Sequence, residues 1–84
     1  MEYRSRTEIV RQILEAANGG GGITKAQILY KASLSHAQLK EYLAILTEND
    51  FLGYDFGTRT FKITEKGHRF LEIYNGMEDL VVKA

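Results

Sequence analysis

Polar and cationic side chains are concentrated at the start of one short helical segment near the middle of the chain. Ser35 is a candidate N-cap residue, and Gln38 follows it at the spacing of a capping box. From there Leu39, Leu43 and Leu46 recur at helical spacing, which leaves a polar face on the opposite side. A glutamine amide pairs bidentately with adenine, and a lysine suits a phosphate or a guanine. The candidate DNA-contacting residues on this helix are Ser35, His36, Gln38, Lys40 and Tyr42, with Tyr42 at the edge of the face.

Three further cations are candidates for contacts to nucleic acid. Lys25 falls in the first turn of the preceding helical segment, where contacts to phosphate are usual. Arg59 lies near the tip of an expected hairpin, and Lys62 is on the outward register between Phe61 and Ile63. A hairpin that carries arginine can lie along the minor groove. The alternatives are an ordinary solvated helix face and an ordinary exposed hairpin tip.

Other chemistry has little support in the sequence. The chain has no cysteine, and His36 and His68 fall on different expected helices without an acidic residue at ligand spacing, so no metal site is expected. No nucleophile, base and acid would meet in a pocket, so we expect no enzyme, no cofactor and no small-molecule ligand. The run Gly19–Gly22 has no preceding strand and no following Gly-Lys-Ser/Thr, so we interpret it as an exposed loop rather than a phosphate-binding loop.

The candidate residues on the central helix require a particular pair of elements to hold them. Thr24, with Gln27 three residues later, starts a first short helix, and Ala32-Ser33-Leu34 breaks it before Ser35 starts the second. Two short helices joined by a tight turn form a helix-turn-helix pattern. In that motif the second helix enters the major groove of DNA with its N-terminal residues on the base edges.

Segments with other spacings of apolar residues flank the two central helices. A helix is expected from about Arg6 to Ala17, strands in 51–56 and 59–63, and a last helix from Glu65. The order of helix, helix, helix, hairpin and helix predicts a mainly α-helical α+β fold, the winged helix-turn-helix. We expect one domain over residues 1–84, with the helix-turn-helix in 24–49, the hairpin (here called the wing) in 51–63 and the C-terminal helix in 65–81.

The last helix carries more large apolar residues than one side of a helix usually buries against its own domain. A partner helix would explain this excess, so we expect a homodimer. The alternative is a helix packed entirely against its own domain. The predicted dimerisation residues are Phe70, Ile73, Tyr74, Met77, Leu80 and Val81.

The charge balance limits the kind of partner. The formal net charge is zero, which argues against a strongly basic protein that coats DNA irrespective of sequence. A local cluster of cations would still suffice for DNA binding. No apolar run approaches the roughly 18 residues that a membrane span needs, and no signal peptide is evident, so no membrane association is expected. The cations whose gathering on one face would favour DNA are Arg4, Arg6, Lys25, Lys40, Arg59 and Lys62.

Four stretches together resemble a family of small archaeal winged-helix proteins: RTEIVRQILEAAN, GITKAQILYKASLSHAQLKEYL, NDFLGYD and FKITEKGHRFLEIY. The resemblance covers residues 2 to 80. It implies DNA binding, a cytoplasmic location, a homodimer formed through an antiparallel coiled coil of the last helices, and a role in transcription regulation or chromatin architecture. This chain departs from that pattern in its short final helix, which leaves about four turns for a coiled coil.

Two functional hypotheses follow. The first is a homodimeric protein that binds double-stranded DNA, most simply a transcription regulator, with the second helix of the central pair in the major groove and the wing on the backbone or minor groove. The second is a winged-helix module that binds proteins without binding DNA, which the zero net charge leaves open.

Overall fold

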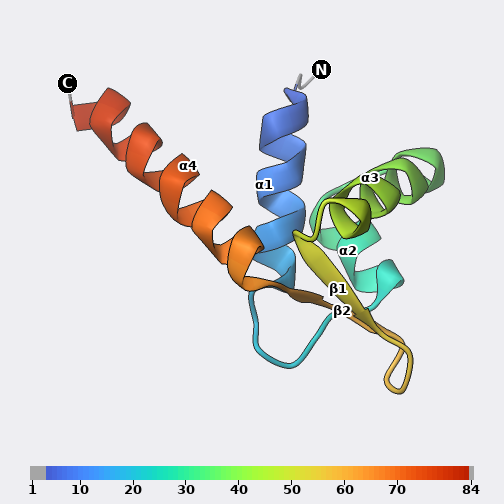
Figure 1. Cartoon of the computed structure of the whole chain (residues 1–84). Coiled ribbons are helices and arrows are strands. Elements are labelled where there is room, and N and C mark those ends of the chain that lie inside the picture. The colour runs from blue at the N-terminus through green and yellow to red at the C-terminus, as the bar shows by residue number, and fades with distance from the viewer. Residues whose placement is uncertain (1–3, 84) are drawn as a thin grey trace.

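Four helices and one β-hairpin make up the part of the chain that the structure describes (Figure 1). This computed structural model describes the backbone of residues 4–83 and the side chains of residues 4–76. The order of the elements confirms the fold expected from the sequence. The elements are α1 (Arg6–Ala17), α2 (Lys25–Lys31), α3 (His36–Glu48), β1 (Leu52–Asp55), β2 (Thr60–Ile63) and α4 (Glu65–Lys83).

Side-chain caps set where the first three helices begin. The Ser5 hydroxyl accepts a hydrogen bond from the backbone N–H of Glu8 at 3.1 Å. Thr24 and Ser35 each start a capping box that is completed by the glutamine three residues later. Between α2 and α3 the chain reverses at Ser33, whose φ of 52° lies in the left-handed region. The caps of α2 and α3, together with the turn at Ser33, fix the angle at which α3 leaves the turn.

The wing is a two-stranded antiparallel sheet in which Tyr54 pairs with Phe61. Ile23, just before α2, forms an isolated bridge to Phe61, with N–H···O distances of 2.9 and 2.7 Å. Gly22 makes this approach possible, because its φ is 84° and a Cβ there would lie 2.5 Å from the Thr60 hydroxyl oxygen. The wing is thereby anchored beside the start of α2.

The turn of the wing is wider than the sequence predicts. The sequence predicts strands that extend to Phe56 and resume at Arg59, whereas the pairing ends at Asp55 and Thr60. The reason is local, because the Asp55 carboxylate accepts from the Gly57 N–H at 2.9 Å and Arg59 adopts a φ of 57°. Phe56 and Arg59 therefore lie in the turn.

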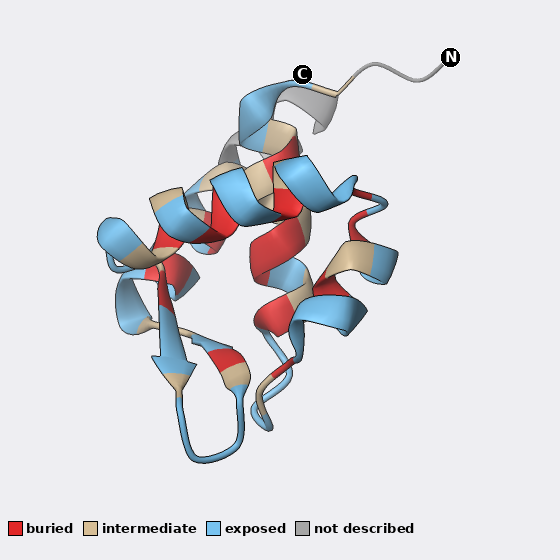
Figure 2. Ribbon diagram, turned by 90° about the vertical axis from the view of Figure 1, so that its right-hand side faces the viewer, coloured by how far each residue is buried: buried red, intermediate tan, exposed pale blue. Residues whose placement is uncertain are grey.

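The core lies where α1, α2, α3 and the base of the wing meet. Figure 2 shows buried positions along the inner faces of the helices, whereas the tip of the wing is exposed. Gly67 lets α4 approach the wing closely, because a Cβ there would lie 2.5 Å from the Phe51 carbonyl oxygen. The largest fully buried side chains are those of Ile13, Leu14, Ile28 and Leu46.

Helix α4 begins against the core and then diverges from it. Its first turn is capped by the Thr64 hydroxyl, which accepts from the Gly67 N–H at 3.0 Å, and Leu71 is buried. Farther along, α4 projects away from the other elements (Figure 1). Within the described residues, no helix is both long and apolar enough to cross a membrane.

Candidate nucleic-acid interface

A groove between α2, α3 and the wing brings three of the predicted site residues together. Lys25, His36 and Lys40 line it, and Phe61 of β2 contributes to its wall. All three polar residues are exposed to solvent. The remaining lining residues of this surface, here called the α3 groove, are Leu39, Leu43, Ala44 and Thr47. No described carboxylate lines the α3 groove, so two lysines give it a local positive charge although the whole chain is neutral.

Ser35 and Gln38 are occupied by the cap of α3. The Ser35 hydroxyl accepts from the Gln38 N–H at 3.2 Å, and the Gln38 side-chain oxygen accepts from the Ser35 N–H at 3.0 Å. A bidentate contact to adenine needs both the oxygen and the nitrogen of the amide. Such a contact would therefore compete with the capping box. The observed role of this pair is to position α3.

The expectation that Tyr42 lies at the edge of the exposed face is wrong. Its side chain is buried, with 5% of its surface exposed. Tyr42 follows Leu39 by three residues and precedes Leu46 by four, so it falls on the apolar stripe of α3 rather than beside it. The Arg6 guanidinium covers the ring at 5.9 Å from its centroid. We therefore exclude Tyr42 from the contacts proposed below.

The two cations of the wing differ in their surroundings. Arg59 is exposed in the turn. Lys62 is exposed as well, but it points to the face of the hairpin opposite Phe61, where it lines a hollow with Gly22. It also pairs with the Asp55 carboxylate at 3.7 Å. Lys62 is thus turned away from the α3 groove.

The two N-terminal arginines are engaged elsewhere. Arg4 donates to the Ala32 carbonyl at 2.6 Å and to the Ser33 carbonyl at 3.0 Å, and so holds the turn before α3. Arg6 pairs with Glu41 at 3.6 Å. Helix α1 begins at the opposite end of the molecule from the wing tip (Figure 1). The six cations considered from the sequence therefore do not gather on one face.

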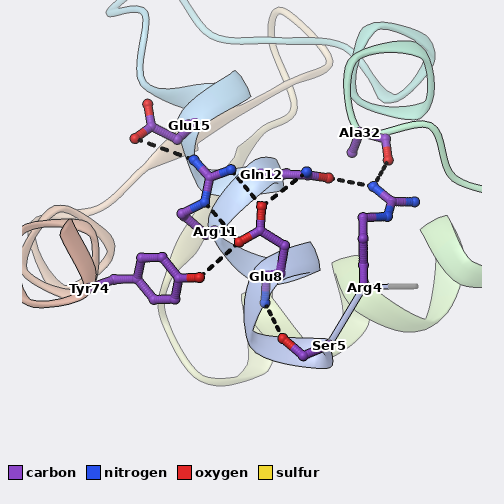
Figure 3. A network of polar contacts seen from close by, with 8 residues as sticks. All are labelled: Arg4, Ser5, Glu8, Arg11, Gln12, Glu15, Ala32 and Tyr74. Atoms are coloured by element: carbon purple, nitrogen blue, oxygen red, sulfur yellow. Dashed lines mark hydrogen bonds and ion pairs between the residues drawn. The ribbon is translucent and has the colours of Figure 1, made fainter. Parts of the chain in front are cut away.

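A polar network centred on Glu8 connects three parts of the fold (Figure 3). Its carboxylate accepts from Arg11 at 2.7 and 3.2 Å, from the Gln12 amide at 3.1 Å and from the Tyr74 hydroxyl at 2.8 Å. These hydrogen bonds, that of Arg11 first and that of Tyr74 second, lower the pKa of Glu8 to about 2. Arg4 in turn donates to Gln12. The network joins α4, through α1, to the turn before α3.

The sequence patterns described above do not predict this network. The spacing of Glu8 to Arg11 and Gln12 on one helix was a usable signal, because residues three and four apart face each other. Tyr74 lies 66 positions from Glu8, and no local pattern indicates such a pairing.

The predicted dimerisation residues have three different environments. Phe70 is half-buried against the core, with its ring 5.7 Å from that of Phe51. Tyr74 is half-buried and bonded to Glu8, whereas Ile73 is 64% exposed. Met77, Leu80 and Val81 lie outside the residues whose side chains the structure describes.

No metal site is seen among the described side chains. Within residues 4–76, no three His, Cys, Asp or Glu residues are grouped as they would be to hold a metal ion. His36 and His68 are both exposed, the first in the α3 groove and the second beside the glycine loop.

Comparisons with known proteins agree with this fold. A family model described as winged helix-turn-helix matches residues 3–81. Three chains of solved structures match as well. One is the crystal structure of Sso10a-2, a DNA-binding protein from Sulfolobus solfataricus, which is 23% identical, has a TM-score of 0.73 and is aligned over 95% of this chain and 88% of that chain. No curated protein matches significantly. At this identity the similarity of the structures concerns the fold.

Proposed function

The chain belongs to the winged helix-turn-helix family, and on that premise we propose that it binds double-stranded DNA with α3 in the major groove and the wing on the backbone or minor groove. The observation that carries the proposal is the α3 groove, where Lys25, His36 and Lys40 converge without a described carboxylate. The similar fold of a protein known as DNA-binding supports it.

The residues have separate roles in this proposal. Lys25 and Lys40 contact phosphates or guanine, and His36 donates to a base or a phosphate from the start of α3. The Ser35 and Gln38 cap holds α3 at its angle, and the Ser35 N–H remains part of that cap. Arg59 reaches the minor groove from the wing.

We further propose a homodimer formed through α4. The exposed Ile73 and the projection of α4 away from its own domain support this (Figure 1). Two copies would present two α3 helices to one duplex, about 34 Å apart if they read successive major grooves. The role proposed for this dimer is that of a transcription regulator that acts by occupying its DNA site.

The second candidate function is a protein-interaction module. Tyr30 on α2 is 87% exposed, and an exposed aromatic residue is a common anchor in protein interfaces. This candidate predicts no binding to any duplex at low salt.

Fluorescence anisotropy with a labelled random duplex, at low and then moderate salt, tests the proposal. The wild type should bind, and the Lys25→Ala/Lys40→Ala double variant should bind at least about tenfold more weakly. The matched control is Arg69→Ala/Lys66→Ala on α4, which removes the same charge away from the α3 groove. Absence of binding at low salt, or an equal loss in both double variants, would contradict the proposed interface.

A further inference from the structure

An aromatic ring projects into solvent from the turn of the wing. Phe56 is 84% exposed, although large apolar side chains are usually buried. Its ring lies 4.8 Å from that of Tyr54 in an edge-on contact, and the Tyr54 ring lies 4.8 Å from that of Phe61. Three rings thus lead from the buried Phe61 to the tip of the wing. Only the outermost ring is free to enter another molecule, since Tyr54 is 37% exposed and Phe61 is 5% exposed.

The turn that carries Phe56 is held in shape before any partner binds. The Asp55 carboxylate accepts from the backbone N–H groups of Gly57 at 2.9 Å and Thr58 at 3.4 Å. The Thr58 and Thr60 hydroxyls lie 2.7 Å apart. A side chain on an ordered turn loses less conformational entropy on binding than a side chain on a flexible loop.

The position of the ring matches that of the proposed DNA-contacting cations. Tyr54 and Phe61 are cross-strand partners, so they share one face of the hairpin, and Phe61 lines the α3 groove with Lys25 and Lys40. Arg59 lies in the same turn as Phe56. The Asp55 carboxylate, at the end of β1 next to this turn, is paired with Lys62 at 3.7 Å. This charge pattern suits a polyanion better than an apolar protein patch.

We propose that Phe56 acts as an apolar wedge that enters the minor groove of bound DNA, partly unstacks one base step and kinks the duplex there. The inference rests on the proposed function and adds to it a specific contact and a preferred substrate, a duplex with a flexible pyrimidine–purine step. Proteins that bind the minor groove use apolar side chains in this way, and pyrimidine–purine steps such as TA are easily kinked or unstacked. A single projecting ring fits a wedge, whereas a platform for single strands requires several exposed rings.

Two readouts on one duplex test this inference. A duplex of about 25 base pairs carries 2-aminopurine at a central TA step and a donor and acceptor dye at its ends. Unstacking raises the fluorescence of 2-aminopurine, and a kink raises energy transfer between the ends. With the wild type both signals should rise on binding. Phe56→Ala should abolish both rises and weaken binding about tenfold, whereas Phe56→Leu, which keeps an apolar wedge, should retain most of both.

Tyr30→Ala is the matched control, because Tyr30 is equally exposed but lies on α2 outside the α3 groove. It should leave both signals at their wild-type values. If the wild type binds without either rise, or if Phe56→Ala shows the same rises as the wild type, the wedge is overturned while DNA binding by α3 stands. If the wild type binds no duplex at low salt, both the wedge and the proposed function are overturned.

Discussion

The hydroxyl of Tyr74 donates a hydrogen bond to the carboxylate of Glu8 at 2.8 Å, and this bond ties α4 to α1. Glu8 also accepts from the Gln12 amide, whose oxygen accepts from Arg4, and Arg4 holds the Ala32 carbonyl at the end of α2. A continuous set of polar contacts therefore connects the helix proposed for dimerisation with the turn that sets the angle of α3.

Tyr74→Phe should destabilise the fold by about 1–2 kcal/mol, because it removes a hydrogen bond to a charged acceptor and keeps the ring. Urea unfolding followed by circular dichroism measures the change. Tyr30→Phe, at a position that is 87% exposed, serves as the control and should leave the midpoint unchanged. An unchanged midpoint for Tyr74→Phe would mean that this bond contributes nothing to stability.

The Glu8 network should make stability dependent on pH in the acid range. In the folded protein the pKa of the Glu8 carboxyl is lowered from the ordinary 4.5 to about 2, so the folded state favours the charged carboxylate. That contribution is fully present above about pH 5 and is lost as the pH falls through 4.5 toward 2. The difference in urea midpoint between the wild type and Glu8→Gln should therefore shrink between pH 5 and pH 2. A difference that stays constant over this range would contradict the assignment.

One substitution at two glycines of α4 should have opposite effects. At Gly67 an added Cβ would lie 2.5 Å from the Phe51 carbonyl oxygen and 2.7 Å from Ile63, so Gly67→Ala should destabilise by about 1–3 kcal/mol. At Gly76 a Cβ meets nothing within 4 Å, so Gly76→Ala should stabilise by up to about 1 kcal/mol through helix propensity. Thermal unfolding of both variants checks the pair. Stabilisation by Gly67→Ala would show that α4 does not approach the wing this closely.

Local signals explain what the sequence could predict. Thr24 and Ser35 each precede a glutamine at capping-box spacing, so the starts of α2 and α3 were readable from neighbouring residues. The burial of Tyr42 can also be inferred from the sequence, because a residue three positions after Leu39 and four before Leu46 lies beside both on a helix. Its hydroxyl group instead favoured a place at the edge of the polar face. The fold was thus more predictable than the use of single side chains.

Other features depend on tertiary contacts. Lys62 pairs with Asp55 diagonally across the hairpin, because the strand register sets Lys62 opposite Gly53 and Asp55 opposite Thr60. Gln38 fits two sequence patterns, that of a capping-box residue and that of a reader of adenine. In the structure its side-chain oxygen accepts the hydrogen bond of the cap from the Ser35 N–H. Gln38 as a reader of adenine stays a prediction, as do the contacts of Lys25, His36, Lys40 and Arg59.

Lys40 and Lys62 provide a matched test of which face binds DNA. Both are exposed lysines, so Lys40→Ala and Lys62→Ala lower the net charge equally, but Lys40 lines the α3 groove and Lys62 lies on the opposite face of the wing. Neutralising a lysine that contacts a phosphate reduces the slope of log K against log salt by about 1. We expect that reduction for Lys40→Ala, together with weaker binding to all sequences. For Lys62→Ala we expect a slope close to that of the wild type, because the ammonium group of Lys62 already pairs with Asp55 at 3.7 Å.

Anisotropy titrations at four salt concentrations measure both slopes. If Lys62→Ala has the larger effect, the duplex lies on the back of the wing, and the α3 groove is not the principal contact surface.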